Sequence, residues 1–124
     1  FVPLDTMRFT TFHRKLMAKG IVLDNDLKFM DSHRKQLKAK YPQFSAYLEH
    51  FTVPQQLVDS IISDGKKQKI EPKDKAELDR TLVYLRAQLK ALIARDIWDM
   101  SQYFQVMNQQ SDIVTKALEV INRP

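Results

Sequence analysis

The feature that most constrains the fold is a long stripe of apolar side chains in the second half of the chain. From Leu82 to Met107 the apolar residues recur at steps of three and four, at positions 82, 85, 89, 92, 93, 97, 100, 104 and 107. Neither glycine nor proline occurs between Lys73 and Arg123. A helix that buries one side produces this spacing. The pattern therefore predicts one long, mostly buried helix over about residues 75–108.

Five further helices are expected around this one, joined by short connections. Their predicted bounds are about 6–19, 23–40, 43–50, 52–65 and 111–121, and a bend in the long helix is permitted near residues 99–101. Gly20 and Pro42 end the first two helices, because glycine adopts the left-handed conformation cheaply and proline cannot continue a helix. Two glycines in the whole chain are few for a sheet protein, whose turns use glycine. We therefore predict an all-α fold of about six helices.

Several residues are expected to begin helices or to fill the core. Asp5 or Thr6 suits the start of the first helix, Thr52 with Gln55 has capping-box spacing, and Asp74 suits the start of the long helix. A polar break at residues 108–110 is expected to precede a last helix capped by Ser111. The predicted buried stripe of the second helix consists of Leu23, Leu27, Met30, Leu37 and Tyr41.

Length and charge limit the classes of function. A chain of 124 residues has the size of one domain, and we expect residues 6–124 to form it after an extended lead-in at residues 1–5. The net charge of +5 belongs to residues 1–70, which carry 12 Lys or Arg against 7 Asp or Glu. Residues 71–124 carry 8 of each. The absence of cysteine excludes disulfides and thiolate metal sites. No apolar run is long enough to span a membrane, and no signal peptide is visible.

The histidines and the first aspartates give little indication of a metal site. His13, His33 and His50 stand on separate predicted helices, and none lies three or four positions from a second histidine. A zinc site therefore has no local support, and we expect solvated or edge histidines. Three further acidic residues, Asp24, Asp26 and Asp31, lack the alternation, central glycine and closing glutamate of a calcium loop. Asp24 and Asp26 are expected to serve as capping and helix-dipole residues near the start of the second helix.

The acidic and aromatic residues near the end of the long stripe are the strongest remaining candidates for chemistry. Asp96 and Asp99 could form a carboxylate pair for acid–base catalysis, but a surface position or an ion pair with Arg95 or Arg86 is the expected outcome. A pocket lined by Trp98, Tyr103 and Phe104 is the alternative to the core positions that we expect for these aromatics.

No motif of a catalytic or cofactor-binding protein occurs in the sequence. With only Gly20 and Gly65, no phosphate-binding glycine loop can form, and no serine lies in a nucleophile motif. We therefore predict no catalytic residue, no cofactor site and no metal site in these residues. A small self-contained enzyme would require the titratable residues to gather in one pocket.

Basic residues in the first two predicted helices raise a second possibility, an acidic partner or nucleic acid. The residues concerned are Arg14, Lys15, Lys19, Arg34, Lys35, Lys38 and Lys40. They are interleaved with Asp and Glu, and many stand near helix ends, where the helix dipole favours cations. This charge pattern disfavours a nucleic-acid-binding function. A free-standing basic helical module is kept as the alternative hypothesis.

Nearly the whole chain resembles one family, through many short matches in order. The N-terminal matches are Phe1–Thr6, Phe12–Leu16 and Ala18–Gly20, and the middle ones are Lys40–Pro42, Phe44, Tyr47 and Phe51–Val53. The strongest match is Leu89–Met100 (LKALIARDIWDM), which is followed by Tyr103, Phe104, Asn108 and Lys116–Glu119. Together these segments resemble the C-terminal helical tail of Bacteroidetes-type carboxyl-terminal processing (tail-specific) serine peptidases.

The resemblance implies a non-catalytic C-terminal domain of an exported enzyme of the periplasm or cell envelope. Its parent would carry a PDZ module and a Ser–Lys catalytic pair upstream, and no residue here matches that pair. The first residue is Phe1 and not methionine, so we expect a processed product or an excised fragment. The expected partners are the upstream PDZ and peptidase domain and the protein or peptide substrates of the parent. Candidate contacts with that domain, expected to lie exposed, are Val2, Leu4, Met17 and Phe29.

Overall fold

The computed structural model describes residues 9–122, which form six α-helices and no strand. The helices are α1 (Thr11–Ala18), α2 (Ile21–Lys40), α3 (Phe44–His50), α4 (Gln55–Lys67), α5 (Lys75–Ile97) and α6 (Met100–Asn122). The prediction of an all-α fold with six helices is thus confirmed. The expected lead-in at residues 1–5 and the caps expected from Asp5 or Thr6 lie outside the described residues.

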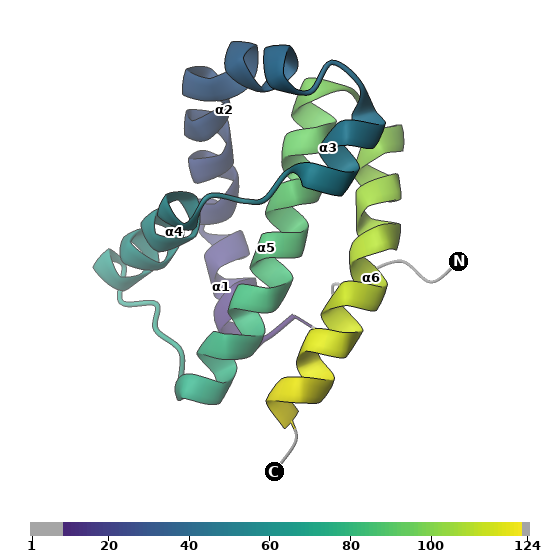
Figure 1. Ribbon diagram of the computed structural model, residues 1–124. Helices are drawn as coiled ribbons and strands as arrows, with labels where there is room; N and C mark the ends of the chain where they lie inside the picture. Colours follow the sequence, from purple (N-terminus) through teal and green to yellow (C-terminus); the bar gives the residue numbers. More distant parts are fainter. Residues whose placement is uncertain (1–8, 123–124) are drawn as a thin grey trace.

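The last two helices form an antiparallel hairpin (Figure 1). The prediction of one helix over residues 75–108 is therefore wrong. The chain leaves the helical conformation at Trp98, with φ −115° and ψ −101°. The side chain of Asp99 then accepts a hydrogen bond from the backbone N–H of Ser101 at 2.8 Å, and α6 begins. Ser111 and the polar residues 108–110, where a break was expected, lie inside α6.

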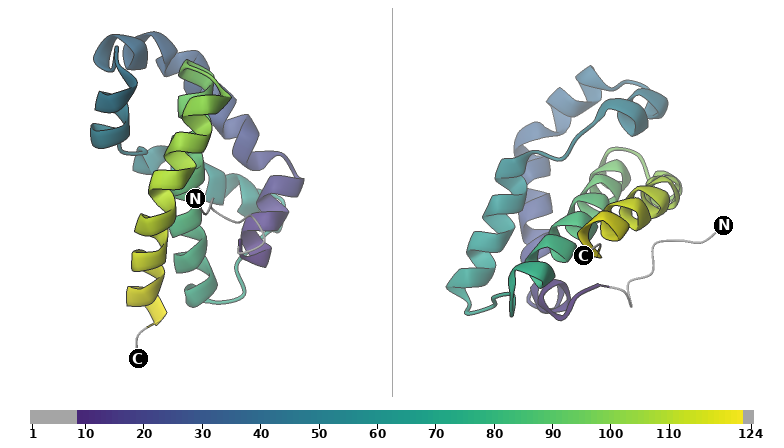
Figure 2. Two further views of the ribbon diagram at one scale, coloured as in Figure 1. Left: turned by 90° about the vertical axis from the view of Figure 1, so that its right-hand side faces the viewer. Right: turned by 60° about the horizontal axis from the view of Figure 1, so that its bottom comes forward.

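Helix α5 is the axis of the fold. It packs against α1, α2, α4 and α6, and Figure 2 shows these helices arranged around it. Leu85, Leu89 and Ile93 on α5 are fully buried, as the apolar stripe predicts for this half of the segment. In contrast, α6 packs chiefly against α5, and Met100 and Phe104 at its start are 47% and 52% exposed. The buried stripe predicted across both helices is wrong at these two positions.

The helix starts are set by local hydrogen bonds that the sequence predicts only in part. Asp74 caps α5 as predicted, because its carboxylate accepts from the N–H of Glu77 at 2.8 Å. Gly20 has the expected left-handed conformation, with φ +72°, between α1 and α2. Thr10 caps α1 by accepting from the N–H of His13. The capping box expected at Thr52 does not form, because α4 begins after Pro54 without a side-chain cap.

The inner face of α2 carries two buried polar residues, Asn25 and Asp26. Neither residue belongs to the apolar stripe that the sequence predicts as the buried side of this helix. Leu23 and Leu27, which were expected to be buried, are 38% and 51% exposed. The stripe is thus wrong at these two leucines, although Met30, Leu37 and Tyr41 are buried as predicted.

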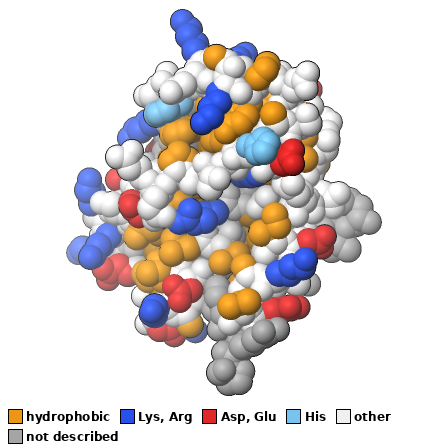
Figure 3. Space-filling model, in the orientation of Figure 1, with side chains coloured by type: hydrophobic (Ala, Val, Ile, Leu, Met, Phe, Trp, Pro, Cys, Tyr) orange, Lys and Arg blue, Asp and Glu red, His pale blue; other side chains and the backbone are white. Residues whose placement is uncertain are grey.

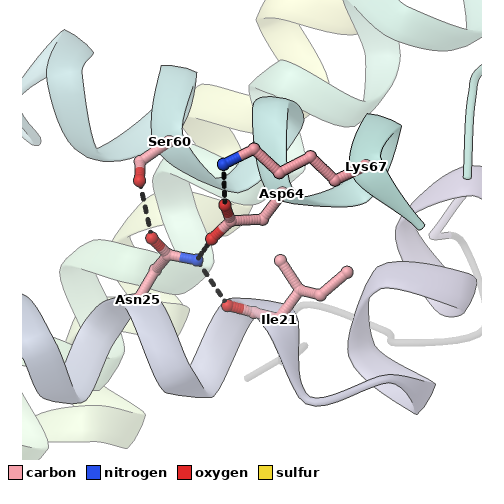
Figure 4. Close-up of polar contacts among 5 residues, drawn as sticks. All are labelled: Ile21, Asn25, Ser60, Asp64 and Lys67. Atoms are coloured by element: carbon pink, nitrogen blue, oxygen red, sulfur yellow. Dashed lines mark hydrogen bonds and ion pairs between the residues drawn. The ribbon is translucent and has the colours of Figure 1, made fainter.

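Asn25 joins α2 to α4 through a network of hydrogen bonds (Figure 4). Its side-chain N–H groups donate to the carbonyl of Ile21 at 2.9 Å and to Asp64 at 3.0 Å, and its oxygen accepts from the Ser60 hydroxyl at 2.8 Å. Lys67 lies 3.9 Å from the Asp64 carboxylate. Because the amide has partners for both its donor and its acceptor group, its burial is compensated.

Candidate functional site

The turn between α5 and α6 is held by aromatic packing on α3. The ring of Trp98 meets the rings of Phe44 and Tyr47 edge-on, with centroids 5.3 Å apart in both cases. Tyr47 is fully buried, and its hydroxyl donates to the backbone carbonyl of Lys90 on α5. Trp98 and the half-buried Tyr103 pack against the core, as expected, whereas Phe104 is exposed. The aromatic residues of this segment therefore fix the position of the turn against α3.

A pair of buried carboxyl groups lies next to this turn. Asp26 on α2 is fully buried, and its side chain faces that of Asp96 on α5, where a hydrogen bond between them requires that one carboxyl be protonated. Counted as two ionised groups, the pair leaves both oxygens of Asp26 and Oδ2 of Asp96 without a donor. A single proton on one Asp26 oxygen, donated to Asp96 Oδ2, gives a partner to two of these three oxygens. The structure thus indicates a protonated Asp26 that donates to Asp96.

Electrostatics support this protonation state. Burial raises the pKa of Asp26 to about 8, and the hydrogen bond and the negative charge of Asp96 act in the same direction. Arg95 and Arg34 lower it and offset part of the effect. Burial raises the pKa of the Tyr47 hydroxyl, and the nearby carboxyl groups of Asp26 and Asp96 raise it further. At neutral pH the pair therefore carries one negative charge.

The two aspartates near the turn have separate structural roles. Asp96 forms the predicted ion pair with Arg95, with an N–O distance of 3.2 Å. Asp99 is exposed and begins α6, so it makes no pair with Asp96. The expectation that Asp26 caps α2 is wrong, because Asp26 lies inside the helix and faces α5. Sequence spacing could not show the Asp26–Asp96 pair, because the two residues lie on different helices far apart in the chain.

His13 is a buried structural residue, contrary to the expected solvated or edge position. Its ring stacks on Phe9 with centroids 4.1 Å apart, and Nε2 donates to the side-chain oxygen of Gln88 at 2.8 Å. Burial lowers the pKa of His13 to about 4, so the ring is neutral at physiological pH. The hydrogen bond of a neutral ring to Gln88 ties α1 to α5.

The other two histidines lie at one pocket of about 380 Å³ between α2 and the connection from α3 to α4. His33 is half-buried, stacks on Phe29 with centroids 4.3 Å apart, and donates from Nδ1 to the Phe29 carbonyl at 3.0 Å. His50 is exposed, and its Nε2 lies 3.8 Å from Glu49. The sequence gives no sign of this pocket, because its two sides come from segments that are adjacent only after folding.

The basic residues do not gather in one place. All seven are exposed, but those of α1 and its C-terminal cap lie at one end of α2, and those from Arg34 to Lys40 lie at the other (Figure 1). A helix of this length is about 30 Å long. The convergence considered for an acidic partner or nucleic acid is thus absent from the described part of the chain.

Metal-binding clusters and membrane-spanning helices are both absent from the described residues. No group of three or more His, Asp or Glu side chains among them is arranged to hold a metal ion. None of the described helices combines the length and the apolar character needed to cross a membrane. The candidate sites are therefore the buried carboxyl pair and the pocket bordered by the two histidines.

Comparison with known proteins gives one match. No curated protein and no solved structure matches the chain significantly. The sequence model of a family of unknown function, DUF8443, matches residues 12–99. The matched segment runs from α1 to the turn after α5, and it contains the carboxyl pair and both sides of the histidine pocket. Since the match covers more than half of its residues, the chain belongs to the family of unknown function DUF8443.

Proposed function

We propose that this chain is the non-catalytic C-terminal helical domain of an exported carboxyl-terminal processing serine peptidase. The observation that carries the proposal is the structural role of the segment with the strongest resemblance to that family, Leu89–Met100. Within it, Asp96 forms an ion pair and meets Asp26, and Trp98 packs on α3. Asp99 then begins α6. The residues that resemble the peptidase tail thus hold helices together. This observation favours a structural, non-catalytic role beside a catalytic domain elsewhere in the parent protein.

The surface that we assign to contact with the upstream PDZ and peptidase domain is the start of α6. Residues 100–111 contain no charged side chain, although several of them are exposed. Met100 and Phe104 project into solvent there. Depletion of charge combined with exposed aromatic and methionine side chains is typical of the centre of a protein interface.

The contacts considered from sequence alone are replaced by this surface. Met17 and Phe29 were expected to lie exposed, but both are half-buried and pack against the core. Val2 and Leu4 lie outside the described residues.

The first test is the sequence upstream of this domain in the same gene. The proposal requires a peptidase domain with a Ser–Lys pair there, and a gene without one would refute it. The second test compares Phe104→Ser with Val120→Ser in the full-length protein. Val120 is an exposed apolar residue near the other end of α6. We expect Phe104→Ser to speed interdomain cleavage in limited proteolysis several-fold, and Val120→Ser to leave its rate unchanged.

A matched measurement on the isolated domain separates docking from folding. Because both side chains are exposed, each substitution should change the free energy of unfolding by no more than about 0.5 kcal/mol. Equal rates of proteolysis for Phe104→Ser and Val120→Ser in the full-length protein would contradict the assigned surface. Proteolytic activity in the isolated domain would contradict its non-catalytic character.

A further inference from the structure

The pocket between α2 and the α3–α4 connection has the dimensions and the lining of a ligand site. Its volume of about 380 Å³ falls within the usual range for small-molecule pockets. Aromatic rings of Phe29, Tyr41 and Phe51 form part of its wall. Because Tyr41 and Phe51 are buried and Phe29 is half-buried, this wall is set by the core and not by mobile surface side chains.

The polar part of the lining is cationic or neutral. His33, His50 and Lys40 line the pocket together with glutamine and threonine side chains, and no Asp or Glu is among the lining residues. Figure 3 shows two histidine side chains at the borders of a hydrophobic area near the top of this face, with a Lys or Arg side chain over it. The combination of an aromatic wall and a cationic border is complementary to a ligand with an apolar ring and a negative charge.

Lys40 is placed to supply the charge for such a ligand. Its ammonium group lies 5.7 Å from the centroid of the Tyr41 ring, and it forms no ion pair among the described residues. The imidazole of His33 is oriented by the hydrogen bond that its Nδ1 donates to the Phe29 carbonyl, so Nε2 is an acceptor in the neutral ring and donates to a carboxylate only in the imidazolium form.

Two further pockets among the described residues lack this combination. The groove between α5, α6 and the segment Phe51–Val53 also contains two cations, but both have partners. Arg86 donates to Gln55, and Lys90 donates to the carbonyl of Leu48 at 2.8 Å. The cleft between α1 and the start of α5 contains Asp74 and Glu77 beside its basic residues, so its own carboxylates compete with an anion.

We propose that the pocket at His33, His50 and Lys40 binds a small aromatic carboxylate. The ring packs against Phe29, Tyr41 and Phe51, and the carboxylate accepts hydrogen bonds at the cationic border, chiefly from Lys40. This proposal does not depend on the peptidase assignment, because it rests on the lining of the pocket alone.

The test is a titration of the isotope-labelled chain with 3-phenylpropionate, followed by NMR. We expect saturable shifts of the ring resonances of His33 and His50 and of the amides around Phe29 and Phe51. The neutral analogue 3-phenylpropanamide should bind at least tenfold more weakly, because a charge-assisted hydrogen bond is lost. Acetate, which lacks the ring, should not compete at concentrations at which 3-phenylpropionate saturates the site.

Two substitutions with one matched control assign the site. Lys40→Gln should weaken binding of 3-phenylpropionate about tenfold, whereas Lys38→Gln removes the same charge from an exposed position outside the lining and should leave binding unchanged. Gln56→Glu places a carboxylate on the border and should weaken binding by a similar factor. All three positions are exposed, so the fold should be retained, which circular dichroism checks.

Any of four results would overturn the proposal. These are the absence of saturable shifts at the lining residues, equal affinity for the acid and the amide, displacement by acetate alone, and equal weakening by Lys40→Gln and Lys38→Gln. The last result would indicate attraction by net charge and not by a defined site.

Discussion

Two neighbouring residues on α2, Asn25 and Asp26, bring polar groups into the core in different ways. Asn25 faces α4, where its amide donates to Ile21 and Asp64 and accepts from Ser60. Asp26 faces α5, where its carboxyl meets Asp96 and has no other hydrogen-bond partner among the described residues. The hydrogen bonds of Asn25 form whether or not Asp26 is protonated. The contact between Asp26 and Asp96 requires a proton on one of the two carboxyl groups.

The Asn25 contact is fixed, because it does not depend on a bound proton. The Asp26 contact is conditional, because it does. A buried amide with all its partners stabilises one arrangement of α2 and α4 and excludes others. A buried carboxyl pair stabilises α2 against α5 only while one group stays protonated, because two adjacent buried charges repel and are poorly solvated. We therefore expect the contact between α2 and α5 to depend on pH and the contact between α2 and α4 to be insensitive to it.

The largest expected effect concerns Asp26→Asn. From about pH 4 to pH 8 the unfolded Asp26 is ionised while the folded one keeps its proton, so the folded state binds more protons. Stability of the wild type should therefore fall as pH rises through this range, by on the order of 4 kcal/mol from this group. Asp26→Asn should remove that part of the dependence. Denaturant unfolding of both proteins at pH 4, 6 and 8 measures it.

The wild type serves as the control for Asp26→Asn at each pH. Other carboxylates contribute equally to both pH profiles, so only the difference is assigned to Asp26. The variant should be close to the wild type at pH 4 and more stable than it at pH 8. Parallel profiles would show that the folded Asp26 is ionised like the unfolded one.

A smaller effect is expected for Asn25→Ala, which removes the fixed contact. We expect a loss of about 2–3 kcal/mol, because three hydrogen bonds are lost and the Ser60 hydroxyl and Asp64 lose a buried partner. Ser60→Ala, which removes one of these bonds, should cost about 1 kcal/mol. Both losses should be equal at pH 5 and pH 8 in denaturant unfolding. A loss from Asn25→Ala that varies with pH as strongly as the Asp26 effect would abolish the distinction between the two contacts.

The polar face of α2 also shows why the sequence predicts this helix well and its buried side poorly. Helix content follows from periodicity and from Gly20 and Pro42, which lie at its ends. The leucine spacing predicts a buried side that includes Leu23 and Leu27, but both of these leucines are exposed. Asn25 and Asp26 take the inner positions because Ser60, Asp64 and Asp96 supply partners from helices distant in sequence. A one-dimensional pattern contains no information on such partners.

The turn after α5 shows the same limit in the backbone. Neither glycine nor proline marks it, and the apolar spacing continues across it, although Met100 and Phe104 just after the turn are exposed and α6 buries residues from Val106 onward against α5. The helix ends where the ring of Trp98 packs on Tyr47 and Phe44, residues of α3 that only the folded chain brings close. The buried position of His13 depends in the same way on Gln88 of α5.

The central claim is that the carboxyl pair between α2 and α5 holds one proton at neutral pH. The most direct measurement is the ¹³C chemical shift of the Asp26 carboxyl carbon as a function of pH in the folded protein. We expect Asp26 to titrate far above the ordinary value of 3.8, with a midpoint near pH 8. A midpoint near pH 4 would show that Asp26 is ionised at neutral pH and that the pair holds no proton there.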